Sequence, residues 1–433
     1  MAEGPGQLDR DLNQWMDAQG SRELAISVLE TAEALLSVGT PDPEAREIWF
    51  RYLNETRKSD FLVALPDAET RNRWAETTYS VIRHLGYGFQ ELMEHRVAEH
   101  PQRTFFQEME AGESRDWSYE AIHRRIRNMA AVFWTRDETP PRVAILSENI
   151  LDGACADLAC LSYDILVSPL NPHFNQENLG WILDELEINT VVVETDELRN
   201  KVQGLRELTR TPFHIYLLDA DASVDGPMES RLAEAMAQLG QEEVDDILEK
   251  RPRREITDLA TVMFTSGSTG RPKGVQFTIY NLITKRFARA AALPEVGNGE
   301  VLFCFLPLYH TFGRYLEMTG MMFWGGTYVF AGNPSLETLL AGLKRVRPTG
   351  LISIPRRWQQ IKETCLEEMD AAGDKTVRAA AFRDVVGDRL RWGLSAAGAL
   401  EPAAFHFFQR HGVDLCSGFG MTEATGGITM TPP

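Results

Sequence analysis

The chain has 433 residues, of which 43% are hydrophobic and 25% charged, as in an ordinary globular protein of two or three domains. Its 44 Lys and Arg residues stand against 63 Asp and Glu, giving a net charge of −19 that disfavours nucleic acid and anionic lipid as partners. Residues 1–20 lack the basic start and apolar core of a signal peptide, and no apolar run reaches the roughly 18 residues of a transmembrane helix. We therefore expect a cytoplasmic protein without a transmembrane segment.

The first 85 residues predict an all-helical extension of unknown role, in three stretches. Ser21 is a capping residue for a helix that stops near Gly39, and Asp42-Pro43 places a cap before a proline at the start of the next. A third helix is expected from Asp67 to Leu85.

From about residue 86 the pattern changes to alternating strands and helices. The expected elements are a helix Phe89–His100, a strand Val143–Leu146, a helix Leu151–Leu161, a strand Ile165–Val167 ending at Ser168-Pro169, a helix from Asn175 to Leu186, and strands Thr190–Val193 and Phe213–Leu218. Such alternation favours an α/β domain with a largely parallel sheet. Residues 220–256 are expected to form an acidic, solvated, helix-prone connector, and Val301–Leu308 a buried strand with its exit.

The five cysteines are expected to be buried, reduced thiols. None forms a C-x-x-C pair and their number is odd, which argues against both a metal site and a complete set of disulfides.

The most informative segment reads TVMFTSGSTGRPKG, from Thr261 to Gly274. A β-prone run leads into a loop of glycines and small hydroxyl residues, and Lys273 follows. Glycines let the backbone approach a ligand closely, successive N–H groups can surround an anion, and the lysine adds a positive charge. The loop is not a Walker loop, because Gly274 follows the lysine where that motif has Ser or Thr.

TSGSTGRPKG resembles the phosphate-loop signature of the acyl-adenylating superfamily, which includes acyl-CoA synthetases, peptide-synthetase adenylation domains and luciferases. The resemblance covers about Phe89 to Pro433. Within it, Val167–Glu194 and Phe323–Ile361 are similar to long-chain acyl-CoA synthetases and to the adenylation domains of carboxylic acid reductases. It implies the large N-terminal domain of the acyl-adenylating fold over residues 86–433, with largely parallel sheets flanked by helices. It also implies ATP contacts from Thr265, Ser266, Gly267, Ser268, Thr269, Gly270 and Lys273.

Two further motifs resemble the same superfamily. LPLYHTFGR, Leu306 to Arg314, resembles the segment that borders the carboxylate pocket, so His310 and Phe312 are candidate site residues and Tyr309–Met322 a candidate pocket wall. SAAGAL, Ser395 to Leu400, resembles a turn of small residues that packs against adenine through Ala397 and Gly398. The superfamily often has glycine where this chain has Ala396 and Ala397, and proline in place of Ala399.

A last motif, SGFGMTEATGG, resembles the G-Y-G-x-T-E signature with phenylalanine in place of tyrosine. An aromatic ring at Phe419 can still stack on adenine without the hydroxyl. The resemblance also implies that Gly420 and Met421 contact the nucleotide. The resemblance implies that Thr422 contacts the α-phosphate and that Glu423 holds Mg²⁺, which suits a hard cation.

The implied activity is AMP-forming acid activation, with Lys273, His310, Thr422 and Glu423 as the catalytic set. A carboxylic acid, expected to be a fatty acid, reacts with ATP in the presence of Mg²⁺ to give acyl-AMP, and coenzyme A then takes the acyl group. One alternative acceptor is a carrier protein or a reductase domain. An alternative from another functional class is a non-catalytic, nucleotide-binding scaffold protein that uses residues 1–85 as a docking module. The resemblance leaves a homodimer open.

The chain ends soon after the Thr-Glu motif, at Pro433. The resemblance implies three later features that we do not find: an aspartate for the ribose, a hinge, and a small C-terminal domain with an adenylation lysine. We expect a fragment of a longer enzyme rather than a naturally short, catalytically reduced protein.

Overall fold

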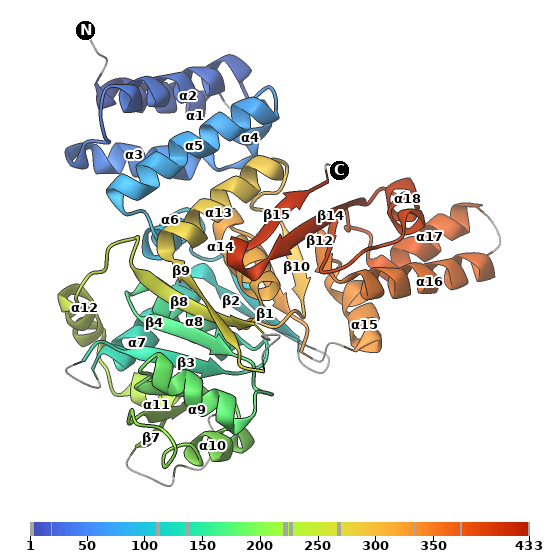
Figure 1. Cartoon of the computed structure of the whole chain (residues 1–433). Helices are drawn as coiled ribbons and strands as arrows, with labels where there is room; N and C mark the ends of the chain where they lie inside the picture. The colour runs from blue at the N-terminus through green and yellow to red at the C-terminus, as the bar shows by residue number, and fades with distance from the viewer. Residues whose placement is uncertain are drawn as a thin grey trace.

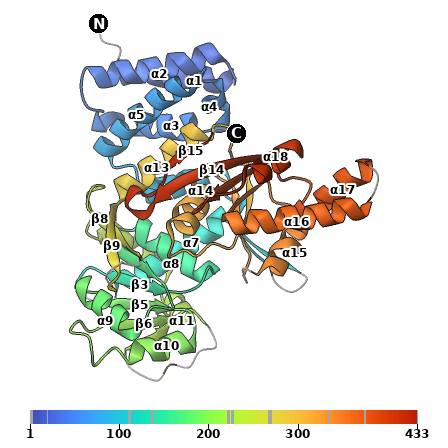
Figure 2. The same ribbon diagram turned by 45° about the vertical axis from the view of Figure 1, so that its right-hand side comes forward.

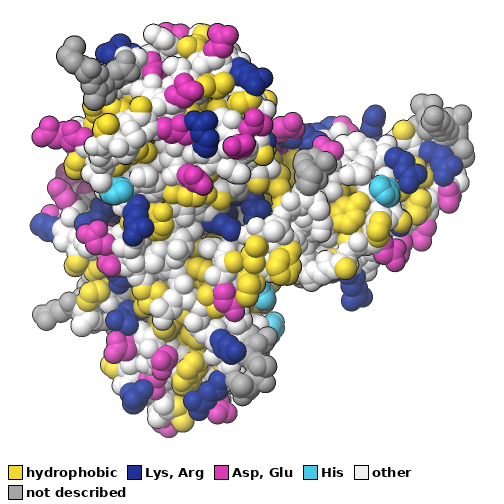
Figure 3. Space-filling model, turned by 45° about the horizontal axis from the view of Figure 1, so that its top comes forward, with side chains coloured by type: hydrophobic (Ala, Val, Ile, Leu, Met, Phe, Trp, Pro, Cys, Tyr) yellow, Lys and Arg dark blue, Asp and Glu magenta, His cyan; other side chains and the backbone are white. Residues whose placement is uncertain are grey.

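A computed structural model of the chain describes residues 4–18, 20–109, 113–135, 139–219, 224, 228–265, 270–332, 335–372 and 375–431. A layer of helices from the N-terminal part lies on one side of two β-sheets, and the C-terminal helices form an arm that projects from the body (Figure 1). Hydrophobic side chains gather where this arm joins the body, while both signs of charge are scattered over the rest of the visible face (Figure 3).

The N-terminal part is entirely helical, as expected. It comprises α1 (Pro5–Asp17), α2 (Arg22–Ser37), a short 3₁₀ turn η1 (Pro43–Ala45), α3 (Arg46–Thr56), α4 (Ser59–Ala64) and α5 (Ala68–Leu85). The Ser21 hydroxyl accepts the Leu24 N–H at the start of α2, and the Asp67 carboxylate accepts the Thr70 N–H at 2.8 Å at the start of α5. These side chains satisfy N–H groups that have no partner inside the helix. The cap predicted at Ser21 is therefore correct, and so is the one predicted at Asp42, whose carboxylate accepts the Glu44 N–H at 2.9 Å.

Two mixed, mostly parallel sheets form the rest of the core. The seven-stranded sheet has the order β7-β6-β5-β3-β4-β8-β9 and the eight-stranded sheet the order β15-β14-β13-β12-β10-β11-β1-β2. Only the pairs β8–β9, β1–β2 and β14–β15 are antiparallel among the described strands. The strands are β1 (Thr104–Met109), β2 (Ser114–Ser118), β3 (Arg142–Leu146), β4 (Leu166–Leu170), β5 (Thr190–Val193), β6 (His214–Leu217), β7 (Glu229–Arg231), β8 (Leu259–Thr265), β9 (Lys273–Thr278), β10 (Val301–Cys304), β11 (Thr327–Phe330), β12 (Gly350–Ser353), β13 (Trp392–Ala396), β14 (Asp414–Met421) and β15 (Gly426–Met430).

Helices flank both sheets, so the predicted α/β class is correct (Figure 2). They are α6 (Phe89–Glu99), α7 (Tyr119–Trp134), α8 (Leu151–Ser162), α9 (Gln176–Glu185), α10 (Asp196–Gln203), α11 (Leu232–Ala237), α12 (Gln241–Lys250), α13 (Ile279–Ala292), the π-helix η2 (Phe312–Met318), α14 (Thr319–Trp324), α15 (Leu336–Val346), α16 (Pro355–Ala372), α17 (Lys375–Val386), α18 (Pro402–Arg410) and the 3₁₀ turn η3 (Thr422–Ala424). No helix in the described ranges combines the length and apolarity needed to cross a membrane. All five cysteines are buried and free, as expected.

One local prediction was wrong. Strand β4 does not stop at Ser168-Pro169 but continues to Leu170, with Pro169 opposite Ile145 of β3. The proline is tolerated because β8 pairs with β4 only at Val167, so no neighbour on that side needs its missing N–H. The helix-prone connector 220–256 contains α11 and α12, as predicted, together with the short strand β7. The predicted strand with its exit over Val301–Leu308 is also present, the strand itself ending at Cys304.

The helical N-terminal part is packed firmly on the α/β part. Helix α5 lies along α13, where the Trp74 ring is 5.7 Å from the Phe287 ring and the Arg71 Nε donates to the Ala291 carbonyl at 3.1 Å. The buried Arg57 guanidinium donates to the Phe323 carbonyl at 2.6 Å. Both parts share one continuous hydrophobic core, so a domain boundary at residue 86 stays a prediction.

Candidate nucleotide and acyl site

The predicted phosphate loop connects two antiparallel strands of the seven-stranded sheet. Thr265 ends β8, Lys273 begins β9, and the two residues pair across the hairpin. Gly270 has φ of +90° and nothing within 4 Å of where a Cβ would lie, so the chain turns there through a conformation that favours glycine. Lys273 is exposed. The predicted contacts Ser266, Gly267, Ser268 and Thr269 lie outside the described residues.

The predicted adenine turn lies beside Phe419. Strand β13 pairs in parallel with β14, with Ala396 opposite Gly418, so the turn that follows β13 emerges next to the aromatic residue. The Phe419 side chain is 64% exposed, which leaves a ring face open for stacking. Ala397 has φ of +65°, in the left-handed region that glycine adopts most easily. This backbone explains why the superfamily often has glycine there.

The Thr-Glu motif forms the connection between β14 and β15. Thr422 and Glu423 lie in the turn η3, which contacts strand β9 of the phosphate hairpin. A Cβ on Gly420 would lie 2.0 Å from the Gly426 carbonyl oxygen, so only glycine lets the two strands come so close. The Glu423 carboxylate is exposed and makes no hydrogen bond or ion pair with another described residue. A single carboxylate next to a phosphate-binding hairpin suits Mg²⁺, which usually takes one or two carboxylates together with phosphate oxygens and water.

The His310 segment borders the same region from the other sheet. His310 precedes the π-helix η2, a rare form that is frequent at functional sites. The surrounding chain partly desolvates the imidazole and lowers its pKa below the ordinary value of about 6.5, which keeps the ring neutral at pH 7. A Cβ on Gly426 would lie 3.7 Å from the Thr311 Cβ, so this segment faces the start of β15.

The structure thus brings four predicted motifs together between the two sheets. β9 contacts η3, β14 pairs with β13, and β15 contacts η2. Figures 1 and 2 show β14 and β15 crossing close to α13 and α14 at this junction. The elements that carry the described site residues therefore contact one another, although the sequence separates the first motif from the last by about 150 residues.

Sequence reasoning assigned no role to Arg314, which is fully buried in η2. Its guanidinium donates to both oxygens of Asp157 in α8, at 2.7 and 2.5 Å, and to the Thr261 hydroxyl in β8 at 2.7 Å. The Thr261 hydroxyl in turn donates to the Val167 carbonyl at 2.6 Å. One side chain thereby fixes the His310 segment to the strand that leads into the phosphate loop. The arginine lies within the LPLYHTFGR motif, but nothing in the sequence pointed to Asp157.

Sequence reasoning also missed the pair Arg286 and Arg289 in α13. Both line a small hollow of about 20 Å³ together with Thr311, Phe312 and Phe419. Two arginines three residues apart on an otherwise apolar helix face were the available signal. The hollow lies where the resemblance places the acid substrate.

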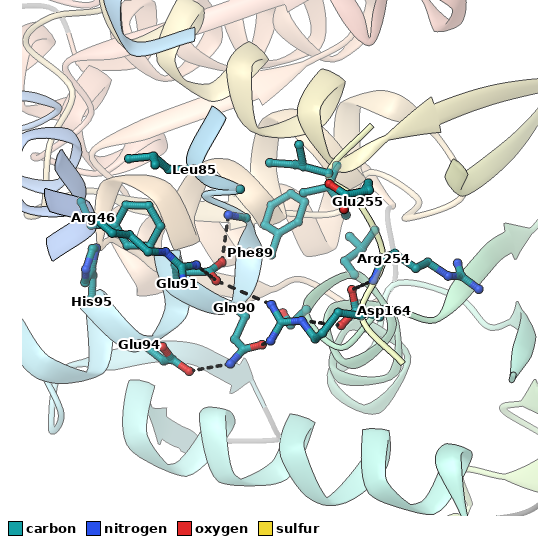
Figure 4. A pocket seen from close by; sticks show the side chains of 18 of the residues that line it. Arg46, Leu85, Phe89, Gln90, Glu91, Glu94, His95, Asp164, Arg254 and Glu255 are labelled. Carbon is teal, nitrogen blue, oxygen red and sulfur yellow. Dashed lines mark hydrogen bonds and ion pairs between the residues drawn. The ribbon is translucent and has the colours of Figure 1, made fainter. Parts of the chain in front are cut away.

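A much larger cavity, of about 1120 Å³, lies away from these motifs, between the N-terminal helices and the α/β part (Figure 4). Its charged side chains pair with one another: Glu91 with Arg46 at 3.4 Å and with Arg253 at 3.8 Å, and Asp164 with Arg253 at 3.4 Å. The Arg254 N–H also donates to Asp164 at 3.2 Å. The contact of Arg46 with Glu91 joins the N-terminal helices to the α/β part, whereas the other contacts lie within the α/β part. None of the predicted site residues lines the cavity.

Comparisons with known proteins agree with this geometry. The model of the AMP-binding enzyme family matches residues 93–433. The chain is 27% identical over 339 residues to a long-chain-fatty-acid–CoA ligase, FadD15, of Mycobacterium bovis, covering 67% of this chain and 53% of the relative. It is 27% identical over 305 residues to a carboxylic acid reductase of Mycobacterium tuberculosis, covering 65% of this chain and 26% of that protein. It is 25% identical over 378 residues to long chain acyl-CoA synthetase 8 of Arabidopsis thaliana, covering 75% and 51%. The chain therefore spans about half the length of the ligases that it matches.

Solved structures show the same fold at low sequence identity. VinN in complex with L-aspartate has a TM-score of 0.64 at 17% identity, covering 80% of this chain and 79% of that one. The anthranilate CoA ligase AuaEII in complex with anthranoyl-AMP has a TM-score of 0.64 at 16% identity, covering 80% and 62%. Since the family match covers well over half of its length, the chain belongs to the AMP-binding enzyme family.

Proposed function

We propose that this chain provides the ATP-binding and acid-binding face of an enzyme that activates a carboxylic acid as acyl-AMP. The observation that carries the proposal is that the elements bearing the four motifs contact one another: β9 contacts η3, β13 pairs with β14, and β15 contacts η2. Family membership supports the same reaction class.

Each group would have a distinct task in the reaction. Lys273 and the loop N–H groups would bind the phosphates, and the Phe419 ring would stack on adenine. Glu423 would hold Mg²⁺, which supplies charge neutralisation at the phosphates when bound. Thr422, beside Glu423 in η3, would donate to the α-phosphate while the acid carboxylate attacks it and pyrophosphate leaves. Such chemistry depends mainly on positioning and on stabilising charge, which fixed donors in a preorganised site provide.

A neutral His310 suits a place beside the reacting carboxylate. A neutral imidazole can donate one hydrogen bond to the acid without forming an ion pair that would hold the carboxylate back from the phosphate. Because its sequence is rich in glycine, the phosphate loop would also close on ATP and open to release pyrophosphate.

The finer assignments are also proposals. Fatty acids are the first substrate class to test because FadD15 and synthetase 8 are named for long-chain acids, and coenzyme A is the first acceptor for the same reason. Transfer of the acyl group to a carrier protein or reductase domain is the second candidate, favoured by the match to a carboxylic acid reductase.

Acid-dependent exchange of pyrophosphate into ATP tests the proposal. The chain is incubated with Mg²⁺, ATP, labelled pyrophosphate and a panel of acids, and Mg-ATP binding is measured separately by calorimetry. We expect the chain to bind Mg-ATP and the Glu423→Ala variant to bind it more weakly. We expect pyrophosphate exchange only when an acid is present. The matched control is Glu401→Ala, an exposed glutamate at the start of α18 that has no place in the site. Equal Mg-ATP affinity in the two variants would show that Glu423 does not hold Mg²⁺.

A non-catalytic scaffold gives a different result. In that case Mg-ATP binds to the chain, no acid in the panel supports exchange, and adding coenzyme A or an acyl-AMP analogue changes nothing. An acyl-AMP analogue that binds more tightly than AMP would instead favour acid activation, because it occupies both halves of the site.

A further inference from the structure

Arg286 and Arg289 stand one turn apart on α13 and project on the same side of the helix. The Arg286 side chain is buried, with only 3% exposed, and Arg289 is half-buried. Both line the hollow that Thr311 and Phe312 close on one side and Phe419 and Thr425 on another. The pair therefore borders the space between the His310 segment and the β14–β15 connection.

The two guanidinium groups lack the partners that other buried arginines have. The Nε and Nη1 of Arg286 and the Nε of Arg289 are buried without a hydrogen-bond partner among the described residues. The one contact of this kind is from the Arg289 Nη1 to the Met430 sulfur at 3.9 Å. By contrast, Arg314 is paired with Asp157, and Arg57 is paired with Glu99 at 3.2 Å. A buried cation without a partner is destabilising by itself, so its presence calls for a ligand.

The electrostatics of the pair point the same way. Burial, together with the smaller effect of the neighbouring positive charge of Arg289, lowers the pKa of Arg286 to about 9. Burial also lowers the pKa of Arg289. Both groups are still cationic at pH 7, so the hollow concentrates positive charge in a chain whose net charge is −19. An anion bound there would relieve the mutual repulsion.

Strand β15, on the opposite wall of the hollow, leaves room for the Arg289 guanidinium. A Cβ on Gly427 of β15 would lie 1.9 Å from the Arg289 Nη2, so the absence of a side chain leaves room for the guanidinium against the strand backbone. The position of Arg289 thus depends on two separate parts of the sequence. This fit is unlike that of a surface arginine, which needs no matching glycine.

We propose that Arg286 and Arg289 form an anion-binding end of the acyl pocket, and that the preferred acid carries a second anionic group, as a dicarboxylic acid does. The proposal rests on acid activation and names its substrate class. One carboxylate would lie by His310 and react with ATP, while the other accepts paired hydrogen bonds from a guanidinium. The hollow of about 20 Å³ holds little more than one water, so side chains must shift to admit an acyl chain and a compact acid fits best.

Matched pairs of acids give the first test. Hexanoate is compared with adipate, and octanoate with suberate, by calorimetric binding to the chain and by pyrophosphate exchange. The monomethyl esters of the two dicarboxylates serve as controls of equal length with one charge removed. We expect the dicarboxylate to bind at least tenfold more tightly than its monocarboxylate partner and its ester. Equal or weaker binding of the dicarboxylates overturns the proposal.

Variants of the pair give the second test. Arg289→Met and Arg286→Met should reduce the preference for dicarboxylates at least tenfold and leave Mg-ATP affinity unchanged, while Arg289→Lys should keep part of the preference. Arg383→Met, on the exposed face of α17, is the control and should change neither. Arg286→Met should also raise Tm without ligand, because it removes an unpaired buried charge. A purely structural arginine would lower Tm and affect all acids alike, and that result overturns the proposal.

The two proposals fail in different ways. Exchange that is supported best by monocarboxylates sustains acid activation and overturns the anion site. Selective binding of dicarboxylates without exchange, together with no binding of an acyl-AMP analogue, sustains the anion site and counts against acid activation.

Discussion

The buried pair of Arg314 and Asp157 allows a quantitative test of how the site is held together. Both side chains are at most 2% exposed, and the guanidinium meets the carboxylate through two hydrogen bonds. Removing one partner leaves the other charge buried without compensation, which destabilises a protein by about 3–5 kcal/mol. We therefore expect Arg314→Met and Asp157→Leu each to lower the free energy of unfolding by that amount.

The shift in melting temperature follows from the size of the chain. At about 2.1 cal/mol/K per residue, 433 residues have an unfolding entropy of about 0.9 kcal/mol/K, so each single variant should lower Tm by about 3–5 °C. In the double variant both charges are gone, and the main remaining losses are the hydrogen bonds to the Thr261 hydroxyl at 2.7 Å and the Tyr315 hydroxyl at 2.9 Å, about 1 kcal/mol each. The double variant should therefore melt about 2 °C below the wild type, closer to it than either single variant.

Differential scanning calorimetry of the four proteins measures these shifts. Arg347→Met is the control, because Arg347 pairs with Asp388 on the surface, where both side chains are about half exposed. It should leave Tm unchanged within error. The reasoning is refuted if the double variant loses as much as the two single variants together, since the pair would then contribute nothing beyond the packing of each side chain.

Three further changes test individual backbone and charge effects. Gly420→Ala forces a methyl group against the Gly426 carbonyl, so calorimetry should show weaker Mg-ATP binding and a lower Tm, whereas Gly39→Ala, with open space around it, should show neither. Ala397→Gly relieves a left-handed backbone at φ +65° and should raise Tm by about 1 °C, from about 1 kcal/mol, and a lower Tm would contradict this. Burial raises the pKa of Glu317 well above its ordinary value, so the folded state retains its proton and stability falls as pH rises above about 4.5. Glu317→Gln should therefore flatten the fall of Tm between about pH 5 and 8, and parallel curves for the two proteins would contradict the assignment.

Glu317 itself has an unusual environment. Both carboxyl oxygens are buried without a hydrogen-bond partner within the described ranges, and the side chain belongs to the same π-helix as Arg314. The nearby Leu306 N–H lowers the pKa of Glu317, against the effect of burial, but it does not form a hydrogen bond of ordinary geometry with the carboxyl group. An uncharged acid is the species that such a setting tolerates, because an ionised carboxylate would have no compensation there.

Local signals in the sequence located the elements where chain neighbours determine the structure. Ser21 and Asp67 cap the helices predicted from them, and Thr190–Val193 is a strand with the predicted ends. The π-helix was not predictable in this way, because its extra residue is stabilised by contacts with other strands and helices. Pro169 shows the same limit, since whether a proline ends a strand depends on which neighbour needs its N–H.

The residues of the candidate site show the same difference between local signals and long-range contacts. Lys273, His310 and Glu423 could be named because each lies in a short motif whose residues are adjacent in the sequence. Asp157 could not, because its role arises from a contact between segments over a hundred residues apart. Arg286 is visible in the sequence as one of two arginines on a helix face, but its lack of partners appears only in the folded chain. A motif predicts which chemistry is present, whereas the supporting residues appear only when the chain is folded.

Helix α13 connects the N-terminal helices to the acyl side of the site. One side of it carries Phe287, which packs against Trp74 of α5 and against Phe323 at 5.0 Å. The other side carries Arg286 and Arg289 toward the hollow. Helix α5 therefore packs on the same helix that carries the two guanidinium groups of the proposed anion site. The helical extension, which the sequence offered only as a separate module, supports that helix directly through the contact of Trp74 with Phe287.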